Sequence, residues 1–484
     1  MRMAERIAGD SRRMHAATAA AAVLVLASAC CSCLSLKPAS DGVSDQFLPP
    51  EFGREAGEDA EHPNRWWEDF GSEELSRLIR DCLAGNLTLA AAEARFKQAA
   101  AVARKAGAVL VPEVSLTSGA GVTRSRQEAG GASERADGDS THTVEDYSLG
   151  LAASYELDLW GRVRSGRRSA LELAGASRDD MAAAAMSLAA QTADRWLRVI
   201  EQRAQLDLLH RQIETNRAQL ELIELRRRKG LATALDVYQQ EQVAAAAEAL
   251  VPLAEGSLEV SRHALAVLLG KPPRTDLDIM QGVLPDMPDA PSPGLPADLL
   301  ARRPDVRAAW RRLESAGWEV AAARAERLPA IRITGSASYR ADELNTVFDN
   351  WLVNLAAGLT APVVDGRRRR AEVDRTAALR DERLAQYGQA VLTAVREVED
   401  ALVQEDRQQE HLAALEAQLR YAEKALDEAH RQYRKGRGDY LRVLLATASA
   451  QNLERLVLQA RRERLSLRIA LYRALGGSWM MEER

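Results

Sequence analysis

One ordered set of landmarks occurs twice along this 484-residue chain. The helical, Ala- and Arg-rich segments Leu89–Pro112 and Val306–Pro329 both close on an apolar-Pro step, at an offset of 217 residues. Three later pairs follow at offsets of 205 or 206 residues: Gly161-Arg162 with Gly366-Arg367, Lys229-Gly230 with Lys435-Gly436, and Leu269-Gly270 with Leu475-Gly476. A repeat of this length predicts that the chain folds as two copies of one structural unit.

Each copy contains a very long stretch without helix breakers. Arg167–Arg228 has no Pro and one Gly, and Arg367–Lys435 has no Pro and only Gly388. At about 1.5 Å per residue such helices would reach roughly 90–100 Å. Both stretches end at a Lys-Gly step that is typical of a helix C-cap, and a second helix is expected to return from it. Apolar residues recur every three or four positions, which predicts two antiparallel hairpins that need neighbours to bury their apolar faces.

The hydrophobic period changes to two in four stretches, at about residues 112–122, 146–157, 330–339 and 351–361. Each has apolar residues on one face and small or polar residues on the other, over the roughly 9–11 residues that a transmembrane strand needs. A soluble hairpin with one face on a core is the alternative for any single stretch. The first copy has about twelve more residues between its Pro and its Gly-Arg step. They fall in the polar segment Gly121–Glu145, whose counterpart Arg340–Asn350 is shorter, which predicts a longer solvent loop in the first copy.

Four strands cannot close a barrel, and an open sheet edge cannot lie in lipid. Three copies of the chain would supply twelve strands, an even number within the range of known barrels. The predicted fold is therefore mainly α with a transmembrane β part. Duplicated helical hairpins would form an α-barrel tunnel that continues from a β-barrel, with four strands per protomer and twelve in a trimer.

The N-terminus has the pattern of a signal peptide over residues 1–29, with four arginines before an apolar run from Ala16 to Ala29. Ala27-Ser28-Ala29-Cys30 resembles a bacterial lipoprotein signal, so Cys30 is predicted to carry diacylglycerol and fatty acyl groups. Cys31 and Cys33 are rival positions, and an ordinary leader with unmodified cysteines is the alternative. Residues 30–63, rich in Pro, Gly, Asp and Glu, are predicted to be a tether.

Composition argues against nucleic-acid binding and against catalysis. The formal charge of the whole chain is −5, and removal of residues 1–29, which carry +2, leaves about −7. Cys82 is the only cysteine beyond the N-terminal cluster, so we expect no disulfide framework. The seven histidines have no metal-binding spacing, and no phosphate-binding or nucleophile motif is present. We therefore expect no enzyme activity, no metal and no cofactor other than the N-terminal lipid.

Several local motifs point to a known family. They are the entry segment with Trp66 and Trp67; Tyr155–Arg162 and Ala361–Arg367 where strand turns to helix; and Leu295–Leu300 followed by Arg302, Arg303, Pro304 and Asp305. With these motifs the chain resembles the outer-membrane efflux proteins, specifically the lipoproteins that serve resistance-nodulation-division pumps. The resemblance divides the chain into a first repeat at 64–270, a linker at 271–294, a second repeat at 295–476 and a tail at 477–484.

The motif residues are expected to build the wall of the tube. Pro304 and Asp305 suit a helix start. Gly161-Arg162 and Gly366-Arg367 lie where a permissive backbone is useful between strand and helix. Trp66 and Trp67 are expected to be packing anchors.

The resemblance also implies a function and partners. The chain would be a passive trimeric exit duct for drugs, metals or other small molecules, lipid-anchored in the outer membrane with its tunnel in the periplasm. Its partners would be a periplasmic adaptor and an inner-membrane efflux transporter. The alternatives are the outer-membrane duct of a type I protein-secretion system and, from another class, a periplasmic adaptor or structural coiled-coil lipoprotein.

In this family the aperture lies around the Lys-Gly turns, where acidic side chains and a polar network hold the end shut. Relatives commonly place an Asp and an Arg where this chain has Leu445 and Ala448. We therefore predict Asp236, Asp439 and Arg442 as substitute aperture or gate residues. The alternative for each is a charge on a solvated turn.

Overall fold

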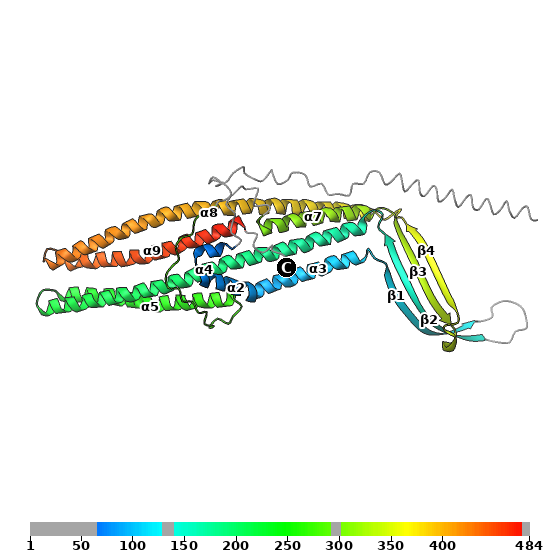
Figure 1. Ribbon diagram of the computed structural model, residues 1–484, viewed down its shortest axis with the longest axis horizontal. Helices are drawn as coiled ribbons and strands as arrows, with labels where there is room; N and C mark the ends of the chain where they lie inside the picture. The colour runs from blue at the N-terminus through cyan, green and yellow to red at the C-terminus, as the bar shows by residue number, and fades with distance from the viewer. Residues whose placement is uncertain (1–64, 128–139, 292–301, 477–484) are drawn as a thin grey trace, which may run out of the picture. The chain divides into compact units, whose positions relative to one another are not determined.

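The computed structural model describes residues 65–127, 140–291 and 302–476, and it divides into two units (Figure 1). In its described residues, unit 1 comprises Val109–Gly166 and Gly317–Thr376. Unit 2 comprises the described parts of Asp41–Ala108, Arg167–Ala316 and Ala377–Arg484.

Helices make up unit 2, and three of them also contribute residues to unit 1. In chain order they are η1 (Trp66–Phe70), α2 (Glu73–Gly85), α3 (Leu87–Ala108), α4 (Arg162–Arg228), α5 (Ala234–Leu268), α7 (Pro304–Ala325), α8 (Arg368–Arg434) and α9 (Tyr440–Leu475). Helices α4 and α5 form one antiparallel hairpin, and α8 and α9 form the other (Figure 1). No helix among the described residues is both long and apolar enough to cross a lipid bilayer.

The helix bounds repeat as the sequence landmarks predict. Helices α3 and α7 both have 22 residues and begin 217 residues apart. Helices α4 and α8 both have 67 residues and begin 206 residues apart. The offset of 205 at the Gly-Arg steps has a local cause. Helix α4 begins at Arg162, directly after Gly161, whereas Arg367 is an extra residue with φ +68° between Gly366 and α8.

Unit 1 contains one antiparallel sheet of four strands in the order β1-β2-β3-β4. The strands are β1 (Glu113–Gln127), β2 (Ser140–Leu157), β3 (Ala330–Ala341) and β4 (Trp351–Thr360), with the short helix η2 (Leu344–Thr346) between the last two. The two copies meet where β2 pairs with β3. Within the described residues β1 and β4 each pair with one neighbour only, so both edges of the sheet are open.

The strand register gathers the alternating side chains onto two different faces. Residues directly opposite one another share a face, and Leu116, Leu151, Ala337 and Val353 form one such row across the sheet. The rows beside it on this face are also mostly apolar, and they include Leu149, Ile333, Tyr339, Trp351, Leu355 and Leu359. The opposite face holds small and polar residues such as Ser115, Gly150, Ser154, Thr334, Ser336 and Asn354. One face of the sheet is therefore mostly apolar, up to the extended ends of β1 and β2.

The first two strands are longer than the ranges 112–122 and 146–157 expected from the sequence. Residues 121–127 and 140–145, assigned to the solvent loop, are paired as strand, with Thr123 opposite Val144 and Gln127 opposite Ser140. The extension has no apolar face to mark it in the sequence. Backbone hydrogen bonds between antiparallel strands form regardless of the side chains they carry.

An aromatic cluster lies in the largest core of unit 2. Trp66 and Trp67 are buried, and the Trp66 ring stacks on Tyr472 of α9 with 5.4 Å between ring centroids. Trp196 of α4 is fully buried and donates its indole N–H to Glu74 at 2.7 Å. Cys82 lies in the same cluster as a buried free thiol, and burial raises its pKa. These contacts attach the entry segment to both repeats.

Helix α7 begins at Pro304, and charged side chains anchor this start. Asp305 accepts a hydrogen bond from the Val306 N–H at 3.0 Å, and Arg302 is half-buried. The buried Arg303 pairs with Asp305 at 2.7 Å and with Glu397 of α8 at 2.9 Å. It also donates to the Ala474 carbonyl at 3.1 Å. The start of the second repeat is thereby joined to its last helix.

Two buried ion pairs tie α9 to its neighbours within unit 2. Arg462 pairs with Glu201 of α4 at 3.1 Å. Arg468 pairs with Glu405 of α8 and also donates to the Pro288 carbonyl, with both charged side chains about 95% buried. Unpaired charges at such depth would be costly, so these contacts fix how the helices pack.

Several predictions fall outside the described residues. They are the signal peptide at 1–29, the tether at 30–63 with Cys30, the segment Leu295–Leu300 and the tail at 477–484.

Candidate functional site: the tips of the helical hairpins

The two hairpin turns have the same backbone geometry. After α4, Gly230 has φ +73° and the Leu231 N–H reaches back to the Arg226 carbonyl at 2.8 Å. After α8, Gly436 has φ +68° and the Arg437 N–H reaches back to the Gln432 carbonyl at 3.0 Å. This is the Schellman arrangement, in which a glycine takes the left-handed conformation that other residues resist. The Lys-Gly steps are helix C-caps, as predicted.

The predicted gate residues Asp236 and Asp439 both cap helices. Asp236 completes a capping box at the start of α5: its carboxylate accepts from the Thr233 N–H at 2.7 Å, and its own N–H donates to the Thr233 hydroxyl at 3.2 Å. Asp439 is the N-cap of α9 and accepts from the Leu441 N–H at 3.2 Å. Arg442 is exposed on the first turn of α9. No hydrogen bond or ion pair joins these three side chains in the described structure, so their role in the gate stays a prediction.

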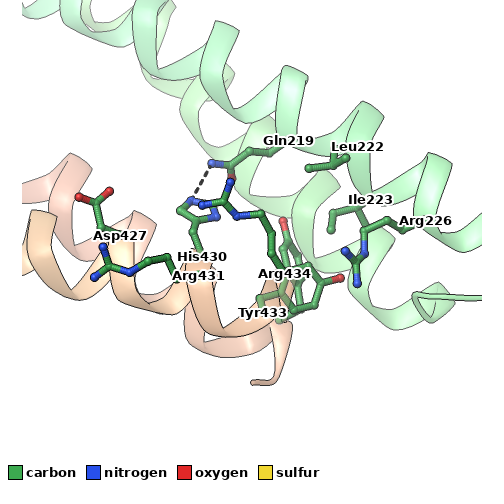
Figure 2. A pocket seen from close by; sticks show the side chains of 10 residues that line it. Gln219, Leu222, Ile223, Arg226, Asp427, His430, Arg431, Tyr433 and Arg434 are labelled. Carbon is green, nitrogen blue, oxygen red and sulfur yellow. Dashed lines mark hydrogen bonds between the residues drawn. The ribbon is translucent and has the colours of Figure 1, made fainter. Parts of the chain in front are cut away.

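A cavity of about 460 Å³ lies beside these turns, between the two hairpins (Figure 2). Helix α4 supplies one wall and α8 the other, and Tyr440 of α9 also lines the cavity. The lining residues are Gln219, Leu222, Ile223, Arg226, Asp427, His430, Arg431, Tyr433, Arg434 and Tyr440. We call this set the tip site. It combines three arginines and a histidine with one carboxylate, so its walls carry an excess of positive charge.

Two contacts cross the tip site from α4 to α8. The Gln219 amide lies 3.4 Å from the His430 Nε2, as the dashed line in Figure 2 marks. The Arg226 guanidinium lies over the Tyr433 ring, 4.6 Å from its centroid. Cation–π and amide contacts of this kind are each worth about 1 kcal/mol. Together these two weak contacts join the hairpins at the tip site.

Tyr440 extends the tip site into a buried polar network. Its ring lies 5.0 Å from that of Tyr433, and its hydroxyl donates to the Gln240 Oε1 at 2.7 Å. Gln240 in turn donates to the Asn216 carbonyl at 2.8 Å, and the Asn216 side chain bonds with Gln451. The network therefore runs through α4, α5 and α9, while the tyrosine ring contact adds α8. All four helices of the two hairpins meet here.

Burial and charge shape the ionisation of these groups. Burial raises the pKa of Tyr440 well above its ordinary value, so its hydroxyl stays a neutral donor. Burial also raises the pKa of Tyr433, where the cation of Arg226 acts in the opposite direction. The carboxylates of Asp236 and Asp439 add to the upward shift at Tyr433, which brings both predicted gate residues within electrostatic reach of the tip site. Burial and the nearby Arg434 lower the pKa of His430.

Sequence reasoning did not single out His430, Tyr433 or Tyr440. His430 is one of seven histidines without metal-binding spacing, and Tyr440 directly follows Asp439 in the sequence. The signal that could have found Tyr440 is an aromatic residue directly after a helix N-cap, at a position that must face the neighbouring hairpin. Among the described residues no group of His, Cys, Asp and Glu side chains could hold a metal ion.

Comparison with known proteins agrees with this architecture. The family model for the outer membrane efflux proteins matches residues 78–271 and 295–477. The chain is 34% identical over 426 residues to the pyoverdine export outer membrane protein OpmQ of Pseudomonas aeruginosa, a match that covers 88% of this chain and 89% of OpmQ. It is 32% identical over 420 residues to the outer membrane protein OprJ of the same species, with 85% and 86% covered.

Solved structures share the fold. The outer-membrane channel OprN aligns with a TM-score of 0.79 at 28% identity, over 92% of this chain and 98% of that one. The open state of the Neisseria gonorrhoeae MtrE outer membrane channel aligns with a TM-score of 0.75 at 27% identity, over 92% and 97%.

The sheet with its apolar face and the long paired hairpins define an outer-membrane channel subunit. The chain belongs to the outer membrane efflux protein family. It is the outer-membrane component of an efflux system, and the family is one of channels rather than of enzymes.

Proposed function

We propose that three copies of this chain close into one duct through the outer membrane. The observation that carries the proposal is the four-stranded sheet, which has one mostly apolar face and, among the described residues, an open edge on both β1 and β4. An unpaired edge in lipid leaves backbone groups without hydrogen-bond partners, and a closed ring of strands removes that cost. Twelve strands from three chains fit the known range of barrels. The apolar face would meet lipid, and the face with Ser154, Thr334 and Asn354 would line the lumen.

We further propose that the helical hairpins form a periplasmic tunnel and that the duct works passively, without enzyme activity. Its partners would be a periplasmic adaptor and an inner-membrane transporter that supplies the energy. The names of relatives refer to the export of pyoverdine and the efflux of toluene. Those names support a small-molecule cargo here over the protein cargo of a type I secretion duct. The four paired strands argue against an adaptor or a structural coiled coil.

Lipidation of Cys30 is part of the same proposal. The diacylglycerol and fatty acyl chains on Cys30 would together give stable attachment to the bilayer, so the lipid would add a second anchor to the one formed by the strands. The intact mass of protein purified from membranes, compared with that of a Cys30→Ser variant, tests the modification. An unmodified wild-type mass at the mature N-terminus would contradict it.

Reconstitution into planar bilayers tests the duct itself. The wild-type chain is expected to form detergent-stable trimers that dissociate on heating and to give discrete single-channel currents. Monomers that produce no current in any lipid would contradict the proposal. A water-soluble oligomer would instead favour a periplasmic role.

We propose that the tip site closes the periplasmic end of the duct, with Asp236, Asp439 and Arg442 tuning it electrostatically. Conductance of an Asp439→Ala variant tests the contribution of the capping residues. Unchanged current and ion selectivity would remove Asp439 from the gate.

The tip site also predicts an acid response. His430 contacts Gln219 on α4. The same cavity is lined by Arg226 on α4, by Asp427, Arg431, Tyr433 and Arg434 on its own helix, and by Tyr440 on α9. Because the pKa of His430 is lowered in the closed contact, the proton binds more strongly once the helices separate. The contact is therefore most stable above the ordinary histidine pKa of about 6.5 and weakens as the pH falls below it. Single-channel current is therefore expected to rise as the pH is lowered from about 8 to about 5.

A His430→Gln variant is the matched control for this response. Glutamine can still hydrogen-bond to Gln219 but does not titrate, so its current is expected to lose the acid-dependent rise. An identical pH profile in the variant and the wild type would assign the response to another group.

A further inference from the structure

The second place where strand turns to helix, residues 361–370, has an unusual surface within unit 1. We call it the second crossing. Val363 and Val364 are each 91% exposed, although both are large apolar residues. Four consecutive arginines, Arg367 to Arg370, follow two residues later. A turn that only faces solvent does not account for two exposed valines next to four arginines. Such a surface is typical of a binding site.

Carboxylates in the second crossing do not neutralise this charge. Asp365 accepts hydrogen bonds from the backbone N–H groups of Arg367 and Arg369, at 3.0 and 3.3 Å, and from the Arg369 guanidinium at 3.2 Å. The Asp365 carboxylate thus accepts its hydrogen bonds from Arg369 and from the backbone at the start of α8. Arg367, Arg368 and Arg370 are exposed, and none of them forms an ion pair with another described residue.

The first crossing provides an internal comparison, because it is the same element in the other copy. There Arg162 pairs with Glu156 at 2.7 Å, and Arg164 pairs with Asp158 at 3.2 Å. Asp158 also accepts from the N–H groups of Val163 and Arg164 at the start of α4. Each arginine of the first crossing within unit 1 therefore has a carboxylate. The surplus belongs to the second crossing alone.

One of the arginines in the second crossing also has a strained backbone. Arg367 is the residue that the second copy has in addition, and its φ of +68° is rare for any residue other than glycine. The preceding Gly366 has φ +62°. A left-handed arginine is unfavourable by itself, and the hydrogen bond from its N–H to Asp365 offsets part of that cost.

Strand β4 ends at Thr360. If the strands cross the membrane as proposed, the residues after Thr360 would leave the hydrocarbon layer at the level of the lipid head groups. Phosphate at that level matches the planar guanidinium group, which binds it through two parallel hydrogen bonds. Exposed valines beside the arginines suit the boundary between head groups and acyl chains.

We propose that the second crossing binds the phosphate groups of anionic phospholipids in the periplasmic leaflet of the outer membrane. Arg367, Arg368 and Arg370 would hold the phosphates, while Val363 and Val364 would contact the acyl chains. The inference rests on the proposed membrane crossing by the strands. It assigns a lipid partner to residues that are not part of the tip site.

The test compares lipid binding by the purified trimer and by an Arg367→Gln/Arg368→Gln/Arg370→Gln variant. Retention of phosphatidylglycerol and of phosphatidylcholine is measured by native mass spectrometry. A basic residue near an anionic surface strengthens binding by roughly five-fold, so three substitutions are expected to weaken phosphatidylglycerol binding by at least about ten-fold. Phosphatidylcholine binding should stay unchanged. A matched triple variant, Arg227→Gln/Arg420→Gln/Arg437→Gln, removes three exposed arginines of unit 2 and should bind both lipids like the wild type.

Three results would overturn the proposal. Equal phosphatidylglycerol binding by the variant and the wild type would remove the arginines from any lipid site. Displacement of the lipid by millimolar inorganic phosphate would identify a site for free phosphate. Dissociation of the variant trimer in lipid-free detergent would place the arginines at a subunit contact. Channel current and trimer formation of the wild-type chain are measured in parallel. If the wild-type chain neither trimerises nor conducts, the proposed duct is wrong, whereas a conducting trimer that does not retain phosphatidylglycerol contradicts only the lipid site.

Discussion

Replacing Arg468 with methionine is expected to destabilise the fold by about 3–5 kcal/mol. Arg468 and Glu405 form the most deeply buried ion pair between α8 and α9 among the pairs described, with side chains 4% and 5% exposed. Methionine fills much of the same volume but leaves Glu405 without its cation in a dry environment. The Pro288 carbonyl also loses the donor that joins this segment to α9.

Chemical denaturation followed by helical circular dichroism, at one fixed protein concentration, measures the loss. A fixed concentration is necessary because assembly of subunits contributes to apparent stability. The matched control is Arg461→Met on the same helix, where the pair with Glu416 is 2.8 Å long but largely exposed. That change should cost less than about 1 kcal/mol.

A double variant separates the cost of an unpaired charge from the value of the pair. With Glu405→Leu and Arg468→Met together, no buried charge remains, and most of the lost stability should return. If the single variant is as stable as the Arg461→Met control, the pair is not buried in the assembled protein. If the double variant is less stable than the single one, the lost packing outweighs the charge effect.

Much of the fold could be predicted because its signals are local or periodic. The alternation in residues 330–339 and 351–361 follows directly from the pleat, and the register places Ile333, Ala337 and Val353 on one face. The Lys-Gly steps mark both turns because only a glycine accepts the left-handed conformation readily. The full length of β1 and β2 could not be predicted, since residues 121–127 have backbone partners but no apolar stripe.

The tip site shows the limit of the same reasoning. The charge of Asp236 and Asp439 predicts gate residues, yet both carboxylates accept hydrogen bonds from nearby backbone N–H groups at helix starts. The contacts that join the hairpins instead link residues more than 190 positions apart, such as Gln240 with Tyr440. Neither residue has a local pattern that identifies its partner. The two turns come together only when the two hairpins pack side by side. The repeat in the sequence does not specify which side chains then meet.

Replacing Tyr440 with phenylalanine is expected to shift the tip site strongly towards its open state. Tyr440 is 3% exposed and Gln240 is fully buried, so the Gln240 acceptor would lose its donor without gaining water. A buried group left unsatisfied in this way costs about 1–3 kcal/mol. A free-energy change of that size alters the ratio of closed to open states by roughly 5- to 150-fold. The ring contact with Tyr433 and the apolar surroundings are retained, which confines the change to the hydroxyl.

Single-channel recording of the reconstituted protein measures this shift as open probability. Tyr238→Phe is the matched control: Tyr238 lies on α5, close in sequence to the turn, but is 62% exposed, so its current should equal that of the wild type. Adding Gln240→Met to Tyr440→Phe removes both hydrogen-bonding partners and should restore part of the closed population, because no buried amide is then left unpaired at that position. An open probability in Tyr440→Phe equal to that of Tyr238→Phe would show that the Tyr440–Gln240 bond does not restrict the duct. The closed end would then depend on contacts between subunits and not on the network within one chain.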